Sequence, residues 1–213
     1  MIRVARAVLP TAIFITGWGW TDVSGFSYSL PRIWICLLIA FFAVLSFPQD
    51  LRGSMGSATS ARQLWVALIA LTGLAAIFCL VAQADRRDLL TMHVWWIPWA
   101  GLALFALGGI LQFVSLRTLG HAYSPFVTLQ ARHRLVQAGP YRFLRHPMYL
   151  GLVLKISGVM AVFRSWLILP VTLAAFLFVG FRIREEEQLL DAHFGSQFRT
   201  YRKRTKRLIP FLY

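Results

Sequence analysis

Two apolar runs in the second half of the chain decide the fold. They are Met148–Phe163, MYLGLVLKISGVMAVF, and Trp166–Phe181, WLILPVTLAAFLFVGF, separated only by Arg164 and Ser165. Each run gives about 24 Å of helix, which is marginal for a bilayer core of about 30 Å. The pattern predicts a tilted helical hairpin over residues 148–181 that reaches the far face of a membrane and returns.

Four further apolar runs precede this hairpin. They extend from about Val4 to Trp20, from Ile33 to Phe47, from Leu64 to Ala82 and from Val94 to Leu116. The composition is 58% hydrophobic and 14% charged, whereas soluble domains have about 45–50% apolar and about 25% charged residues. We therefore predict an all-α, polytopic membrane helical bundle of about six helices, four spans plus the shorter hairpin, with a cytoplasmic C-terminal cap.

The composition changes after Leu116. Residues 117–147 are polar and rich in arginine, and the tail 182–213 is charged. We expect residues 1–116 to form the transmembrane scaffold on the lipid or substrate side. Residues 117–213 would then hold the chemistry, together with the hairpin and a basic amphipathic tail.

The net charge of +14 lies between and after the apolar runs. With the N-terminus inside, 17 Lys and Arg residues fall on the inside and 4 on the outside, which favours cytoplasmic N- and C-termini. The basic segments suit anionic lipid headgroups better than nucleic acid. Arginine outnumbers lysine 19 to 3, which favours a bacterial source and an inner-membrane location. Oligomeric state is left open.

Neither cysteine predicts a disulfide or a metal site. Cys36 and Cys79 both lie inside apolar runs and are typical of small core residues. No Cys/His cluster has zinc spacing, so no metal is expected.

The loop before the hairpin contains a turn and a helix start. Gly139-Pro140 is typical of a turn, and Pro147 suits the first position of a helix. Such a start exposes backbone N–H groups beside Arg145 and His146, which suits a small anionic group. The alternative is a plain positive-inside loop followed by a proline-started helix.

The segment after the hairpin concentrates acidic residues. All three glutamates of the protein, Glu185, Glu186 and Glu187, follow the second apolar run directly. Arg182 and Glu186 are four residues apart and would share a helix face. A charge cluster at a membrane edge favours a functional site, while the alternative is a solvated helix with a weak ion pair.

The C-terminal tail contains an apolar stripe formed by Leu190, Phe194, Phe198 and Tyr201. The stripe predicts one amphipathic helix, and the apolar end 208–213 could pack back against the bundle.

These pieces together resemble the isoprenylcysteine carboxyl methyltransferase family and related membrane phospholipid methyltransferases. The resemblance runs from about Arg117 to the C-terminus, near 45% of the chain. Its pieces are His133-x-Leu135-Val136, Gly139-Pro140-Tyr141-Arg142, Arg145-His146-Pro147-x-Tyr149-x-Gly151, Arg182-x-x-x-Glu186-Glu187, Phe194-Gly195 and Tyr201.

The resemblance implies a methyltransferase that uses S-adenosyl-L-methionine at the cytoplasmic membrane face and releases S-adenosylhomocysteine. By the family pattern, Arg182 orients the carboxylate of a lipophilic or lipidated substrate and Glu186 holds the methionine end of the cofactor. Glu187, the second acid of the pair, has a supporting role in the site. The implied cofactor-binding residues are His133, Leu135, Val136, Gly139, Tyr141, Arg145, His146, Pro147, Met148, Tyr149 and Glu186.

The residue types agree with this chemistry. Methyl transfer to an ionised carboxylate needs neither a metal nor a general base, so the enzyme mainly positions the reactants and excludes water. The identity of the acceptor, and whether it presents oxygen, nitrogen or sulfur, stays open. Lys155, inside the first apolar run of the hairpin, either snorkels to the cytoplasmic side or faces a cavity.

Two other functions compete with methyl transfer. One is an NADPH-dependent sterol or enone reductase with a similar membrane-embedded layout, although the chain has no glycine-rich dinucleotide fingerprint. The other is a non-catalytic lipid-binding membrane protein, for which Arg182 and Glu186 would be dispensable.

Overall fold

The structure is a computed structural model that describes residues 12–45, 61–120 and 135–208. Within these ranges all regular structure is helical, and extended pairing is limited to two isolated bridges, Thr91–Ser165 and Leu144–Lys206. The predicted all-α class is therefore confirmed.

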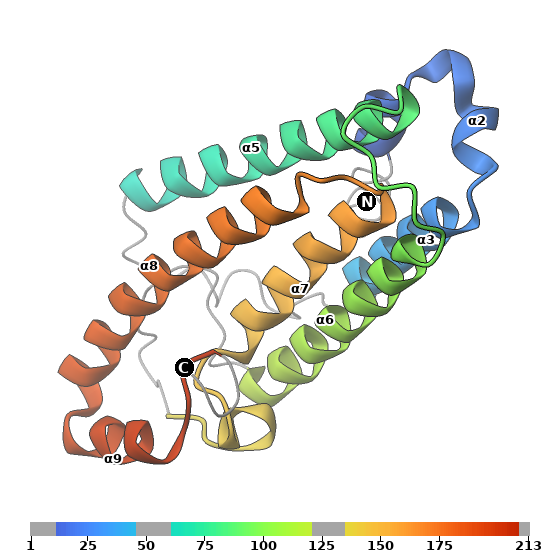
Figure 1. The fold of residues 1–213 in the computed structure, drawn as a ribbon. Helices are drawn as coiled ribbons and strands as arrows, with labels where there is room; N and C mark the ends of the chain where they lie inside the picture. Colours follow the sequence, from blue (N-terminus) through green and yellow to red (C-terminus); the bar gives the residue numbers. More distant parts are fainter. Residues whose placement is uncertain (1–11, 46–60, 121–134, 209–213) are drawn as a thin grey trace.

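Long helices lie side by side, and a short helix crosses one end of the bundle (Figure 1). Residues 12–18 are helical and precede the short elements η1 and α2. The elements that follow residue 18 are η1 Trp20–Asp22, α2 Val23–Ser27, α3 Leu30–Leu45, α5 Ala61–Arg86, α6 Ile97–Leu119, η3 Gly139–Arg142, α7 Pro147–Val162, α8 Ile168–Phe194 and α9 Ser196–Arg204.

The predicted membrane runs lie mostly on helices where the chain is described. Helix α3 covers the described part of the second run, α5 covers the third, and the first run is α-helical over residues 12–18. The earlier part of the first run, residues 4–11, lies outside the described residues. The fourth run was predicted to begin three residues too early, because α6 begins at Ile97 and not at Val94. This start comes just after the exposed Trp95 and Trp96. Among the described helices, α6 is the one both long and apolar enough to cross a membrane, whereas α3 and α7 are apolar but shorter.

Helices α6 and α7 pack with their backbones almost touching. A Cβ on Gly101 would lie 2.7 Å from the Gly158 carbonyl oxygen, and a Cβ on Gly108 would lie 2.6 Å from that of Gly151. On each helix the two glycines are seven residues apart, and the helices are antiparallel, since Gly101 meets Gly158 and Gly108 meets Gly151. Small residues at such contacts let membrane helices approach closely. This packing fixes the start of α7, where the predicted site lies.

The predicted hairpin is confirmed as α7 and α8, but α8 is longer than its apolar run. Arg164 turns the chain with a positive φ of 50°. Helix α8 then continues beyond Phe181 to Phe194 and carries the glutamates on regular helix. The prediction of one amphipathic helix from Leu190 to Tyr201 is wrong, because Gly195, at φ 51°, separates α8 from α9. Glycine adopts this conformation without the strain that a side chain would cause.

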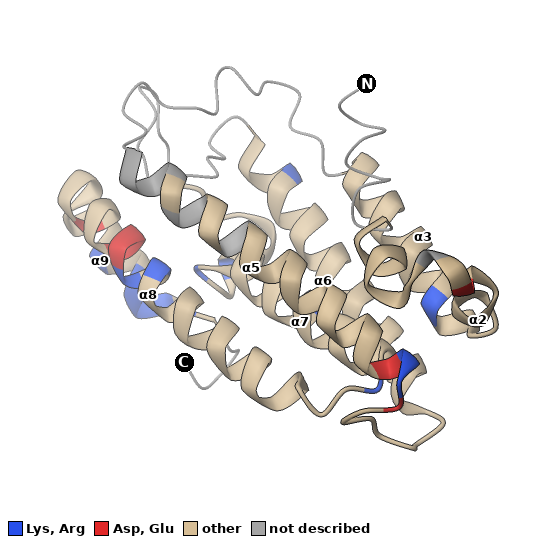
Figure 2. Ribbon diagram, turned by 90° about the horizontal axis from the view of Figure 1, so that it is seen from above, with Lys and Arg blue, Asp and Glu red and all other residues tan. Residues whose placement is uncertain are grey.

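Charged residues gather at the two ends of the bundle, as Figure 2 shows. At the end where α7 turns into α8, Asp85 accepts from Nε and Nη2 of Arg32 at 2.9 and 2.6 Å. Arg164 donates to the other oxygen of Asp85 through the same two atoms, again at 2.9 and 2.6 Å. This network joins α3, the last turn of α5 and the α7–α8 turn.

Candidate active site

The loop before α7 is held by the C-terminal segment of the chain. The amide of Arg145 donates to the Lys206 carbonyl at 2.8 Å, and that of His146 donates to the Arg207 carbonyl at 3.0 Å. In return, the Lys206 amide donates to the Phe143 carbonyl at 3.1 Å. We call residues 205–208 the strap, because they run alongside the loop and fix it at the start of α7.

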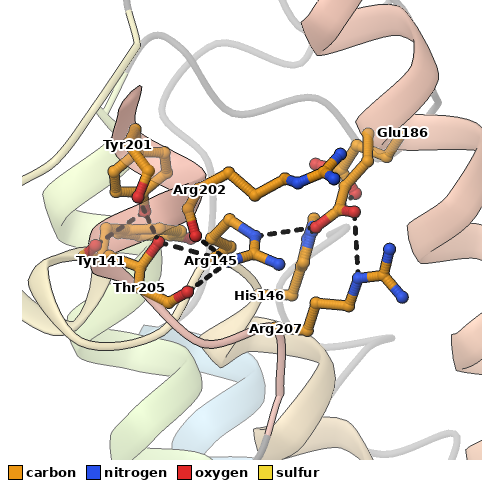
Figure 3. A network of polar contacts seen from close by, with 9 residues as sticks. Tyr141, Arg145, His146, Glu186, Tyr201, Arg202, Thr205 and Arg207 are labelled. Atoms are coloured by element: carbon orange, nitrogen blue, oxygen red, sulfur yellow. Dashed lines mark hydrogen bonds and ion pairs between the residues drawn. The ribbon is translucent and has the colours of Figure 1, made fainter. Parts of the chain in front are cut away.

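Glu187 is the centre of the polar network at this end, and Figure 3 labels the two arginines that pair with it, Arg145 and Arg207. It is buried on α8, yet Arg145 Nε lies 2.8 Å from its Oε1 and Arg207 Nε lies 3.0 Å from its Oε2. Burial alone would raise the pKa of Glu187, but His146 and Arg145 outweigh it and lower that pKa to about 2. Glu187 is therefore ionised at neutral pH, and its charge is taken up by the two arginines.

Arg145 also ties the loop to α9. Its Nη1 donates to the carbonyl of Arg202 at 3.2 Å and to the carbonyl of Thr205. Tyr201 of α9 donates from its hydroxyl to the carbonyl of Tyr141 at 2.7 Å. The loop is thus fixed by α9, by the strap and by α8 at the same time.

His146 lies between the two glutamates. Its Nδ1 is 3.6 Å from Glu186 Oε2, and its Nε2 is 3.5 Å from Glu187 Oε1. The imidazole is buried, and its Nε2 has no hydrogen-bond partner among the described residues. Buried polar atoms usually have such a partner, and the nearest acceptor to this nitrogen is Glu187 Oε1, at a distance longer than a normal hydrogen bond.

Glu186 is the more accessible acid of the pair. Its side chain is 37% exposed, against 6% for Glu187. The hydroxyl of Tyr149 is close enough to interact with both Glu186 and Arg182. Arg182 itself forms an ion pair with Glu185, three residues further along the helix, at 3.6 Å. This pair takes the place of the one expected between Arg182 and Glu186.

The structure brings most of the predicted site residues to one place. Pro147 begins α7 as expected, with Arg145 and His146 before it and Met148 and Tyr149 after it. Gly139 and Tyr141 lie in η3, where Gly139 has a φ of 55° and Tyr141 is buried. Leu135 and Val136 are half-buried at the beginning of the described segment, and His133 lies outside the described residues.

Three contributors to the site were not predicted as such. They are Arg207, Thr205 and Tyr201, whose contacts hold Glu187, Arg145 and Tyr141. We predicted the tail to be a basic amphipathic segment. Such a pattern is typical of a residue run at a membrane surface and does not predict that one of its arginines pairs with a buried acid. The expected return of the apolar end is confirmed for Leu208, which packs against Val153, Val179 and Ile183.

Lys155 faces α6. Its Nζ donates to Gln112 Oε1 at 3.1 Å and lies 5.4 Å from the centre of the Phe105 ring. Gln112 in turn donates to the Met148 carbonyl at 3.2 Å. Within the described residues, no group of three His, Cys, Asp or Glu side chains could hold a metal ion.

Comparison with known proteins agrees with the motifs. Residues 101–192 match the sequence model of the isoprenylcysteine carboxyl methyltransferase (ICMT) family. The chain is 31% identical over 125 residues to protein-S-isoprenylcysteine O-methyltransferase B of Arabidopsis thaliana, a match covering 55% of this chain and 61% of that protein. It is 32% identical over 119 residues to protein-S-isoprenylcysteine O-methyltransferase of Saccharomyces cerevisiae, covering 53% and 48%. These matches span less than two thirds of the relatives' own length.

A solved structure supports the fold over nearly the whole chain. It is the structure of the eukaryotic intramembrane Ras methyltransferase ICMT. The superposition covers 99% of this chain and 76% of the ICMT chain, with a TM-score of 0.63 and 22% sequence identity. The fold is thus that of an all-α membrane bundle, and the resemblance of this chain to the isoprenylcysteine carboxyl methyltransferase family, carried by residues 101–192, is confirmed.

Proposed function

We propose that this protein is an integral membrane methyltransferase that uses S-adenosyl-L-methionine to methylate a carboxylate of a lipophilic or lipidated substrate at the cytoplasmic membrane face. The observation that carries the proposal is the pair formed by Glu186 and His146. A partly exposed acid lies beside a buried imidazole whose Nε2 makes no hydrogen bond of normal length among the described residues, its contact with Glu187 being 3.5 Å. The relatives' names, protein-S-isoprenylcysteine O-methyltransferases, agree with this chemistry.

The charges of the site fit the methionine end of the cofactor. That end carries an ammonium, which needs a carboxylate, and a carboxylate, which needs donors. Glu187 is already neutralised by Arg145 and Arg207, whereas the described ion-pair neighbour of Glu186 is His146 at 3.6 Å. Glu186 is therefore the acid left to pair with an ammonium, and His146 Nε2 is the buried nitrogen left for a further hydrogen bond.

The remaining part of the cofactor would lie along the loop and the first turn of α7. When bound, the cofactor supplies an electrophilic methyl group on a sulfonium. The residues proposed to hold it are His133, Leu135, Val136, Gly139, Tyr141, Arg145, His146, Pro147, Met148, Tyr149 and Glu186.

Arg182 is proposed to orient the acceptor. Its guanidinium is mostly buried at the end of the apolar part of α8, where a lipid-borne carboxylate would arrive. It can exchange its 3.6 Å contact with Glu185 for a bidentate pair with that carboxylate. No proton has to move, because the ionised carboxylate is itself the nucleophile. The work of the site is to align the reactants and exclude water.

The proposal also covers organisation and location. Residues 117–213 would carry out the chemistry, and residues 1–116 would shape the lipid side. A bacterial inner membrane with both termini in the cytoplasm rests on the arginine-rich composition and on the charge distribution of the loops.

Calorimetric titration of S-adenosylhomocysteine into the detergent-purified protein tests this function. We expect micromolar affinity in the wild type, and a loss of at least about tenfold in Glu186→Gln, since a charged hydrogen bond is removed. Glu185→Gln is the matched control and should bind within about twofold of wild type, because Glu185 contacts Arg182 and not His146.

Absence of binding to a folded wild type would overturn the methyltransferase proposal. NADPH would then be titrated to test the reductase alternative. If binding is found, a screen of lipid carboxylates with a labelled methyl donor identifies the acceptor. Arg182→Lys should raise KM in that assay, because the arginine binds the ground state as well as the transition state.

A further inference from the structure

Helix α9 and the strap have an apolar inner side and a basic outer side. Phe198, Tyr201 and Leu208 are buried. Lys203, Arg204 and Lys206 are exposed, and no carboxylate among the described residues lies within ion-pair distance of them. We call these three residues the α9 basic face.

The strap anchors this basic face against the α7–α8 hairpin. Leu208 packs against Val153 and Val179 of the hairpin, within the apolar core of α7 and α8. Lys206 precedes Leu208 by only two residues, so its Cα lies within about 7 Å of that of the anchored leucine. Helix α9 itself lies across the end of the bundle and not along it (Figure 1). A cationic segment with an apolar anchor is typical of binding to an anionic lipid surface.

The inner side of the same segment holds the proposed active site. The strap accepts from the amides of Arg145 and His146, and Arg207 pairs with Glu187. The carbonyls of Arg202 and Thr205 accept from the Arg145 side chain (Figure 3). Whatever stabilises this segment on its outer side therefore also stabilises the position of His146.

We propose that anionic lipid headgroups bind the α9 basic face and hold the strap closed, so that the affinity for the cofactor rises with the anionic lipid content of the membrane. This regulation rests on the proposed function. In a neutral membrane the three cations face water and repel one another. In an anionic membrane the same cations are attracted to the surface, and the attraction adds to the stability of the strap.

Hydrogen exchange of the strap-bonded amides tests the proposal without any cofactor. The protein is placed in nanodiscs of phosphatidylcholine alone or of phosphatidylcholine with phosphatidylglycerol. The amides of Arg145, His146 and Lys206 report opening of the strap, because their hydrogen bonds join the loop to it. We expect about tenfold slower exchange in the anionic discs, and loss of the difference at high salt.

Two variants separate the basic face from general charge effects. The triple variant Lys203→Gln/Arg204→Gln/Lys206→Gln should exchange like wild type in neutral discs and should not respond to phosphatidylglycerol. Arg87→Gln removes an exposed cation after α5, at the opposite end of the bundle, and should respond as wild type does. Equal exchange in both lipids, or a triple variant that still responds, would overturn the inference.

Titration of S-adenosylhomocysteine in the same discs measures the consequence for the site. Wild-type affinity should rise severalfold with phosphatidylglycerol, and that of the triple variant should not. If wild type binds in neither disc, the proposed function fails while the exchange data still decide the lipid effect. Inorganic phosphate added to neutral discs is the last arm. If phosphate alone slows exchange as much as phosphatidylglycerol does, the site takes a free anion and the lipid proposal is wrong.

Discussion

Asp85, in the last turn of α5 next to the α7–α8 turn, and Glu187, far along α8 from that turn, are each paired with two arginines at opposite ends of the bundle. Both carboxylates are buried, and each has one buried arginine, Arg32 or Arg145. The second arginine, Arg164 or Arg207, is 29% exposed in both cases. In charge and burial the two networks are nearly matched.

The networks differ in what they leave unpaired. Each oxygen of Asp85 accepts two hydrogen bonds, one oxygen from Nε and Nη2 of Arg32 and the other from the same atoms of Arg164, so the carboxylate is saturated. Each oxygen of Glu187 accepts from a single arginine Nε. His146 lies beside Glu187, and the partly exposed Glu186 lies on the other side of the imidazole. A saturated network can only hold helices together, whereas one that leaves a buried nitrogen and an accessible acid can also bind a ligand.

Removing the charge of Asp85 should have the largest effect. In Asp85→Asn, Arg32 and Arg164 lose their shared carboxylate, which destabilises a buried pair by about 3–5 kcal/mol. Thermal unfolding in detergent, followed by circular dichroism, measures the loss. The exposed Asp88 provides the control variant Asp88→Asn, which should change the melting temperature little. An unchanged melting temperature for Asp85→Asn would contradict a structural role for this network.

The same change at Glu187 should affect both stability and binding. Glu187→Gln leaves Arg145 and Arg207 without their shared charge, and we expect a loss of about 3 kcal/mol. Affinity for S-adenosylhomocysteine should fall as well, since Arg145 and Glu187 both contact or flank His146. Variants at Asp85 that still fold should bind S-adenosylhomocysteine with wild-type affinity. If Glu187→Gln also keeps full affinity, the Glu187 network has no more part in ligand binding than the Asp85 network.

The pH dependence of stability sharpens the comparison at Glu187. Its pKa is lowered from 4.5 to about 2, so the folded state favours the ionised form. The resulting stability is fully present above about pH 4.5 and is lost as the pH falls towards 2, by about 3 kcal/mol in total. Denaturation measured over this interval should show that loss in wild type and a smaller slope in Glu187→Gln. Equal slopes would mean that the arginines do not hold the charge of Glu187.

The two outer arginines form a matched pair of smaller changes. Arg164→Gln and Arg207→Gln each remove one partly exposed partner, and each should lower the free energy of unfolding by about 1–2 kcal/mol. Only Arg207→Gln should also weaken cofactor binding, because the lost side chain pairs with Glu187, which lies beside His146. Stability and affinity measured on both proteins decide this. Equal effects on affinity would mean that the strap is not specific to the site.

The smallest expected effect is that of Tyr201→Phe. The change removes the hydrogen bond to the Tyr141 carbonyl, worth about 1 kcal/mol. Burial raises the pKa of Tyr201 to about 12, so the hydroxyl remains a donor throughout the neutral range. Chemical denaturation measures the difference, with the exposed Tyr28→Phe as control. A loss above about 3 kcal/mol would show that Tyr201 does more than tie α9 to the loop.

Features with short-range causes were predictable from the sequence. The hairpin follows from two apolar runs broken at Arg164 and Ser165, and Pro147 marks the start of α7 because its missing N–H is tolerated there. The order of the Gly139-Pro140, Arg145-His146-Pro147 and Arg182-x-x-x-Glu186 pieces was sufficient to indicate the family. Each of these signals lies within a few residues, where local geometry is fixed by chain chemistry.

The helical membrane class, the hairpin and the family resemblance could therefore be read from local patterns. Which of the two acids is paired with arginines and which is accessible depends on how the helices pack. Glu186 and Glu187 are neighbours, but a helix turns by about 100° per residue, so one meets Arg145 and Arg207 while the other stays partly exposed. The partners of Asp85 lie 53 and 79 residues away, and such pairings depend on how the helices pack, which no local pattern records.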